Sequence, residues 1–202
     1  KIKGVMETHI HADHLSGAKA LAEIAGARCY IWEKISNEAC NFFDLQIGEN
    51  SIKVMETPGH TNGSVCLLVN NEFLLTGDTL FLEGVGRPDL GRNKEEIEKS
   101  AKSLFASLEK IKNLDKETII LPAHFAGYEK FPISEKLGTL LGSNAALKIS
   151  SEQEFADYIT KNMPIAPPNY EQIKYLNKSH MRVPRQMGEQ LEFGPNRCAS
   201  GD

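Results

Sequence analysis

The sequence lacks two features that would place it in a special class of protein. No apolar run approaches the roughly 18 residues that a membrane-spanning helix requires, so membranes are not expected as partners. The formal net charge is only −4, so there is no cationic excess to attract nucleic acid or an anionic surface. The rest of the composition, with 41% hydrophobic and 25% charged residues, is typical of a globular protein with a packed core.

Cysteine is also scarce. The four cysteines form no C-x-x-C pair, and their spacing matches neither a zinc ribbon nor a zinc finger. Cys29 and Cys66 lie in strand-like runs, where a free cysteine ordinarily behaves as a small buried hydrophobe. We therefore predict a protein of a reducing compartment, with a cytoplasmic location.

Strand-like and helix-like segments alternate along the chain. Strands are predicted at residues 2–8, 28–32, 52–57, 65–70, 73–76 and 118–121, with a tight turn at Asn70-Asn71. Helices are predicted at residues 16–26 and 93–111, and from residues 151 and 169 onward. Residues 179–202 lose this periodicity, so we expect one domain over residues 1–178 and a tail or linker outside the fold.

Histidine is the most informative residue type, because five of the six histidines follow predicted strands and the sixth, His180, lies in the predicted tail. The first strand runs into THIHADH at residues 8–14, where alternation sends His9 and His11 to the same side. Asp13 and His14 follow where the chain leaves the strand and can turn toward the same cavity. Several neutral imidazoles beside a carboxylate form the donor set of a divalent transition metal.

Three more ligand-type side chains follow later strands. His60 lies in TPGHT at residues 57–61, Asp78 in TGDTLF at residues 76–81, and His124 in LPAH at residues 121–124. Any one of them alone would ordinarily be a loop histidine or a turn aspartate. Because loops on a rigid sheet are where sites are assembled, the set together predicts a metal site.

These motifs resemble those of the metallo-β-lactamase superfamily, in the same order and over residues 1 to about 178. The resemblance implies an α/β fold, the αββα sandwich, with its site at one edge of two packed sheets. The family has several strands before the His-x-His motif, whereas only residues 1–8 precede it here, so we expect the domain to be N-terminally incomplete. In the full family pattern one metal takes His9, His11, His60 and Asp78. A second metal takes Asp13, His14, Asp78 and His124.

Two branches of this superfamily, persulfide dioxygenase and glyoxalase II, share TPGHT and GDTLF. The strings THIHADHLSG, GVGRPDL and LPAH are more similar to the dioxygenase branch, and residues 162–178 resemble bacterial dioxygenases that are often fused to rhodanese domains. The resemblance implies an enzyme that oxidises a thiol persulfide with O₂ to sulfite and thiol. Glutathione or coenzyme A is the expected carrier, and a rhodanese partner or fused domain is expected. The aromatic residue that contacts glutathione in this branch has no match at the same offset here, and Phe125 or Tyr128 is the candidate substitute.

For this branch the resemblance implies one Fe(II) held by His9, His60 and Asp78, with adjacent coordination positions left open. The residues expected to orient the ligands and the substrate are His11, Asp13, His14 and His124. Arg87 is a candidate anchor for the carrier thiol or its loop, and an ion pair with Asp89 accounts for it equally well.

Two alternatives stay open. The same side chains would serve a glyoxalase II-like hydrolase with two zinc ions that cleaves a glutathione thioester. A truncated, non-catalytic metal-binding module would account for the short N-terminal segment. The sequence also leaves open whether the chain forms a homo-oligomer.

Overall fold

A computed structural model of the chain describes residues 1–31, 44–124, 132–161, 163–179, 181, 183–193 and 199–200. Among these residues, no helix combines the length and the apolar character needed to cross a membrane. Several residues of the sequence-based predictions lie outside the described ranges. They are Trp32, Cys40, Phe125, Tyr128, Asn162, His180 and Cys198.

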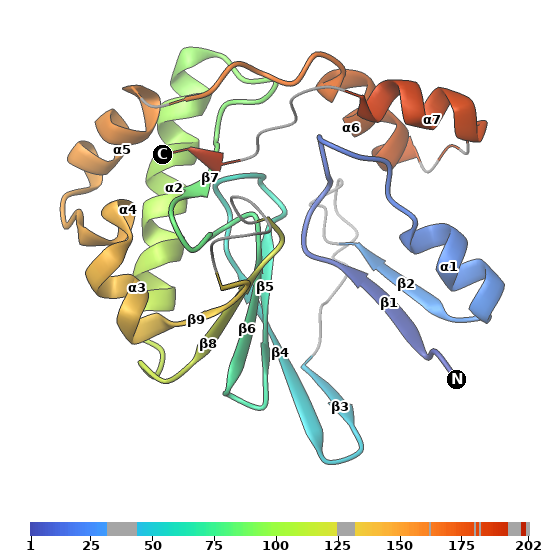
Figure 1. The fold of residues 1–202 in the computed structure, drawn as a ribbon, viewed down its shortest axis with the longest axis horizontal. Coiled ribbons are helices and arrows are strands. Elements are labelled where there is room, and N and C mark those ends of the chain that lie inside the picture. Colours follow the sequence, from blue (N-terminus) through green and yellow to red (C-terminus); the bar gives the residue numbers. More distant parts are fainter. Residues whose placement is uncertain are drawn as a thin grey trace.

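One mixed sheet holds most of the described strands, in the order β3-β4-β5-β6-β8-β9 (Figure 1). These strands are β3 (Leu45–Ile47), β4 (Asn50–Glu56), β5 (Val65–Val69), β6 (Phe73–Gly77), β8 (Ile119–Pro122) and β9 (Glu135–Lys136). β6 and β8 are parallel, and the other neighbours are antiparallel. The turn predicted at Asn70-Asn71 is confirmed, because both residues have positive φ, 54° and 56°, as the two-residue turn of a twisted hairpin requires.

Helices cover one face of this sheet (Figure 1). They are α2 (Lys94–Lys112), α3 (Leu137–Ser143), α4 (Ala145–Lys148) and α5 (Glu152–Lys161). α2 begins with the predicted capping box, in which Asn93 and Glu96 each accept a hydrogen bond from the other's backbone N–H. Its apolar stripe, with Leu104 and Ile111 fully buried, packs into the main core. The helical periodicity therefore identified the buried face of α2 correctly.

A smaller sheet lies across from the large one (Figure 1). β1 (Gly4–Glu7) and β2 (Arg28–Ile31) pair in parallel, and α1 (Ala18–Ala25) connects them. α1 ends where predicted, at Gly26, whose φ of 59° is readily adopted by glycine. The backbone N–H of Val65 donates to the carbonyl of Thr8 at 2.9 Å and ties the two sheets together. The layers α2–α5, large sheet, small sheet and α1 confirm the predicted αββα order.

The C-terminal segment differs from the predicted tail. α6 (Tyr170–Ser179) is followed by α7 (Arg185–Glu192), and Leu191 of α7 packs with Ile173 and Leu176 of α6 in a second apolar cluster. Asn169 also donates to the carbonyl of Leu191 at 3.0 Å, and β10 (Ala199–Ser200) pairs with β7 (Val85–Gly86). Residues 185–192 therefore belong to the fold. The sequence analysis missed this helix because α7 buries only Gly188 and Leu191, which is too few residues to give a clear apolar periodicity.

Candidate metal centre

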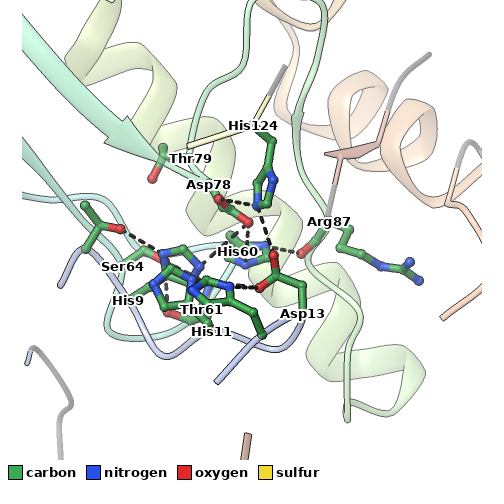
Figure 2. Close-up of polar contacts among 12 residues, drawn as sticks. His9, His11, Asp13, His60, Thr61, Ser64, Asp78, Thr79, Arg87 and His124 are labelled. Atoms are coloured by element: carbon green, nitrogen blue, oxygen red, sulfur yellow. Dashed lines mark hydrogen bonds and ion pairs between the residues drawn. The ribbon is translucent and has the colours of Figure 1, made fainter. Parts of the chain in front are cut away.

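Four connections converge on the candidate site (Figure 2). Loop 1 (residues 8–17) follows β1, loop 2 (residues 57–64) follows β4, loop 3 (residues 78–93) follows β6 and contains β7, and His124 follows β8. β4, β6 and β8 run in the same direction, so their carboxyl ends lie at one edge of the large sheet. This edge faces loop 1, and the site therefore lies between the two sheets.

The buried centre of the site consists of His9, His60 and Asp78, which are 1%, 5% and 1% exposed. One ligand atom from each residue lies within 4.8 Å of the other two. The Nε2 atoms of His9 and His60 lie 3.7 and 3.5 Å from Asp78 Oδ2. The structure thus brings together the three residues expected to hold a single metal, each from a different loop.

A second group, His11, Asp13 and His14, also has ligand atoms within 4.8 Å of one another. Asp13 lies between two histidines, with Oδ1 3.1 Å from His14 Nδ1 and Oδ2 3.3 Å from His124 Nε2. His124 Nε2 lies 3.5 Å from Asp78 Oδ1 as well, so it joins the two groups. The side chains of His14 and His124 are 46% and 38% exposed, so solvent reaches this part of the site.

The donor atoms of the centre fit a bound metal ion. Among the described residues, the buried side-chain polar atoms without a hydrogen-bond partner are His9 Nε2, His11 Nδ1 and both carboxylate oxygens of Asp78. A buried polar atom that lacks a partner costs about 1–3 kcal/mol. That these atoms all belong to residues of one site, and are all metal-ligand types, indicates that a cation satisfies them.

Burial also sets the protonation that a metal needs. It lowers the pKa of His9 to about 3 and the pKa of His11 to about 4, and it lowers the pKa of His60. Burial works to raise the pKa of Asp78, but His9, His124 and His60 outweigh it and hold that pKa well below its usual range. At neutral pH the centre therefore presents neutral imidazoles and an ionised carboxylate.

Hydrogen bonds to the far nitrogens fix how the imidazoles face the centre. His60 Nδ1 lies 2.8 Å from the backbone carbonyl of Arg87. Because a carbonyl can only accept, Nδ1 carries the proton and Nε2 keeps its lone pair toward Asp78. His9 Nδ1 lies 2.9 Å from the hydroxyl of Thr8, which can donate or accept. This contact therefore orients the His9 ring without by itself fixing which nitrogen carries the proton.

Arg87 has a different role from the predicted substrate anchor. Its side chain is 1% exposed and points away from the histidines (Figure 2). The guanidinium donates to both carboxylate oxygens of Asp89 at 2.7 Å, and to the carbonyls of Pro164 and Ile165 at 2.7 and 3.0 Å. Arg87 therefore fixes loop 3 against the segment before α6, and its own carbonyl orients His60. The ion-pair interpretation is the one that the geometry supports.

Asn177 of α6 is a positioning residue that the sequence analysis missed. Its Nδ2 donates to the carbonyls of His11 and His14, both at 2.9 Å, and its Oδ1 accepts from the backbone N–H of Ser16 at 2.9 Å. From α7, Glu192 accepts from the N–H of Leu15 at 2.7 Å. Loop 1 is thus held by the C-terminal helices. A polar residue directly after Leu176, on the buried face of α6, was the available signal.

Gly86 permits a close approach that no other residue would allow. A Cβ at this position would lie 1.8 Å from the carbonyl oxygen of Asp78 and 3.0 Å from the Cβ of His60. The glycine of β7 thereby lets loop 3 fold back onto two of the buried ligand-type residues. The sequence analysis quoted this glycine within GVGRPDL without assigning it a role.

Comparison with known sequences identifies related proteins. Residues 31–124 match the family described as the metallo-beta-lactamase superfamily. The chain is 36% identical over 135 residues to hydroxyacylglutathione hydrolase of Prochlorococcus marinus (strain MIT 9312), covering 61% of this chain and 51% of that protein. It is 30% identical over 186 residues to the mitochondrial persulfide dioxygenase ETHE1 of Homo sapiens, covering 88% and 67%. The chain thus spans about half the length of the hydrolase.

Solved structures share the fold. A metallo-beta-lactamase from Staphylococcus aureus subsp. aureus COL has a TM-score of 0.80 at 30% identity, over 91% of this chain and 60% of that one. ETHE1 from Myxococcus xanthus has a TM-score of 0.71 at 25% identity, over 88% and 77%. Both neighbours share the overall fold of this chain.

Proposed function

The chain belongs to the metallo-β-lactamase superfamily, and on that premise we propose that it is an iron-dependent persulfide dioxygenase. The observation that carries the proposal is the buried trio of His9, His60 and Asp78. Two imidazoles and one carboxylate are the ligand set of non-haem Fe(II) oxygenases. The similarity to a persulfide dioxygenase over 88% of this chain supports the same assignment.

In the proposed reaction the outer sulfur of an anionic persulfide is oxidised and O₂ is reduced. Sulfite takes two oxygen atoms from O₂ and a third from water, and the thiol and a proton are released. When bound, ferrous iron would supply adjacent coordination positions for the persulfide sulfur and O₂. The carrier thiol is proposed to be glutathione or coenzyme A.

The residues around the trio have separate tasks in this proposal. The carbonyl of Arg87 and the hydroxyl of Thr8 keep His60 and His9 oriented. Asp13 holds His14 through Nδ1, which leaves Nε2 of this half-exposed imidazole to exchange protons with the departing thiol. These tasks need no second metal.

A second candidate function has its own support. His11, Asp13 and His14 form a further group of ligand-type atoms within 4.8 Å, as a binuclear hydrolase would require. The identity to hydroxyacylglutathione hydrolases points in the same direction. In that case the protein would hold two metals and cleave a glutathione thioester.

Metal content and activity, measured together, separate the two functions. Elemental analysis of freshly purified protein, without added metal, should give one iron per chain. O₂ uptake should follow addition of glutathione persulfide or coenzyme A persulfide, and S-lactoylglutathione should stay intact. Two metals per chain with thioester hydrolysis and no O₂ uptake would instead establish the hydrolase.

A matched pair of variants makes the test sharper. His60→Ala removes a residue of the buried trio, and His14→Gln removes one of the second group. Under the dioxygenase proposal, His60→Ala loses iron and activity, whereas His14→Gln keeps one iron per chain. Loss of one of two metals in His14→Gln, or retention of iron in His60→Ala, would show that the proposed ligand set is wrong.

A further inference from the structure

A second concave site adjoins the loops that carry the metal-site residues. It is a pocket of about 240 Å³ whose walls come from Ile10 of loop 1, residues 61–63 of loop 2, residues 90–92 of loop 3, Glu96 of α2, and Lys174 and Lys178 of α6. None of the seven candidate metal-site residues lines it. It therefore has its own lining and does not extend the metal centre.

The charged lining of this pocket is mostly positive. Arg92, Lys174 and Lys178 contribute three cations from two separate walls, against the single carboxylate of Glu96. That carboxylate accepts a hydrogen bond from the backbone N–H of Asn93 in the capping box at the start of α2. Lys174 and Lys178 lie one helical turn apart, where like charges repel. An anion between α6 and Arg92 would offset this repulsion.

Size and polarity indicate the class of ligand. Pockets for drug-sized molecules begin at about 300 Å³ and are mainly apolar. This pocket is smaller, and Ile10 and Leu90 are the larger apolar residues that line it. We propose that it binds a small oxyanion of the phosphate, sulfate or sulfite type, through Arg92, Lys174 and Lys178. Lysine is a common phosphate ligand, and arginine matches the geometry of such oxygens.

Arg92 connects this pocket to the metal centre. Its Nη1 donates to the carbonyls of Gly59 and His60 at 3.2 and 3.1 Å, and its Nη2 donates to Asn62 Oδ1 at 3.2 Å. On the opposite wall, Lys174 Nζ donates to the carbonyl of Leu90 at 3.1 Å. An anion held between these cations would tie loops 2 and 3 to α6. Anion binding and retention of the metal should therefore favour each other, and this coupling is reciprocal.

Calorimetric titration of metal-loaded protein with sulfate, at constant ionic strength set by chloride, tests the proposal. The double variant Lys174→Met/Lys178→Met removes two of the cations. Lys148→Met/Lys161→Met makes the same change in charge on α4 and α5, which lie away from α6 (Figure 1). We expect saturable binding by the wild type and the control, and binding about tenfold or more weaker in the pocket variant.

Two outcomes would overturn the proposal. One is the absence of saturable sulfate binding to the wild type. The other is equal affinity in wild type and pocket variant, which would place the anion at the metal. Circular dichroism checks that the double variant is folded. If it is not, the single variant Lys178→Met, at an exposed position of α6, replaces it with the same criteria. The inference holds for either candidate reaction, because the pocket and the metal centre have no lining residue in common.

Discussion

At the scale of single residues, the site combines side chains that would be unfavourable anywhere else in the protein. His9 and Asp78 are each 1% exposed, and the atoms with which they face each other make no hydrogen bond. Unpaired polar atoms at that depth reduce stability. Both residues are of metal-ligand type, and a bound metal ion would account for the fold tolerating them. Arg87 is equally buried, but its guanidinium is matched to Asp89 and to two carbonyls, so its role is structural.

Replacement of Arg87 separates structural support from substrate anchoring. Arg87→Met leaves Asp89 and two carbonyls without their donor, and removing one partner of a buried ion pair typically costs about 3–5 kcal/mol. We expect a fall of this size in the free energy of unfolding, measured by urea denaturation. Arg185→Met, which breaks an exposed pair with Glu189, should change stability by less than about 1 kcal/mol. A stable Arg87→Met variant with only a raised KM would support the anchor instead.

The buried histidines should make the metal-free protein sensitive to acid. Burial lowers the pKa of His9 to about 3 and of His11 to about 4, from 6.5 in the unfolded chain. Below pH 6.5 the unfolded chain therefore binds protons that the folded chain excludes, and each such histidine costs about 1 kcal/mol per pH unit. His14 acts in the opposite sense, because its hydrogen bond to Asp13 raises its pKa.

The net effect is a loss of stability at acidic pH. More histidines of the site have a lowered pKa than a raised one, and His60 is among those with a lowered pKa. After metal removal with EDTA, the urea concentration at the midpoint of unfolding should decrease as the pH is lowered from 7 to 5. Stability that is constant or rises over this range would contradict the proposed protonation states. The same measurement on His9→Gln should show a weaker dependence on pH.

At the scale of elements, the ligand-type residues follow the carboxyl ends of the strands, and the C-terminal helices fix loop 1. Three side-chain hydrogen bonds from Asn177 reach the backbone of residues 11, 14 and 16. The bond from Leu15 to Glu192 adds α7 to the same support. α6 also contributes Lys174 and Lys178 to the pocket that we propose binds an oxyanion. One helix far along the chain therefore supports loop 1, which carries candidate metal ligands, and lines the pocket beside it.

Asn177→Ala should loosen loop 1 and speed the loss of metal. The variant leaves two carbonyls and one N–H without their partner, so we expect a loss of about 2 kcal/mol in stability. The rate of metal transfer to a chelator should rise, as measured by a colorimetric competition assay. Gln172→Ala, at an exposed position of the same helix, is the control and should leave both quantities unchanged. An unchanged transfer rate in Asn177→Ala would show that α6 does not support the site.

At the scale of the whole molecule, the candidate metal centre lies between two sheets and takes residues from both. His9 follows β1 of the small sheet, whereas His60, Asp78 and His124 follow strands of the large one. The large sheet is stabilised by its own core with α2–α5. A metal bound by residues of both sheets would therefore stabilise the position of the small sheet more than it stabilises the core of the large sheet.

Chelation of the metal tests this difference by hydrogen exchange. A ligand at one hundred times its dissociation constant stabilises the folded state by about 2.7 kcal/mol. Removing it should raise amide exchange in residues 4–31 more than in α2, whose residues Leu104 and Ile111 are fully buried. A uniform rise across both regions would show that the metal stabilises the molecule only as a whole.

The sequence by itself determined the elements with strong local patterns, and it singled out the ligand-type side chains that the structure brings together. The turn at Asn70-Asn71 and the cap at Asn93 follow from local chemistry, and the αββα order is what the resemblance to the superfamily implies. The structure confirms all three. Only the tertiary structure decided the packing of α7, the role of Arg87 and the contacts of Asn177. The physical reason is distance along the chain: Asn177 reaches loop 1 across 161 to 166 residues, and Arg87 reaches Pro164 and Ile165 across 77 and 78. Hydrophobic periodicity reports burial within one element, but it cannot show which backbone groups a buried polar side chain will meet.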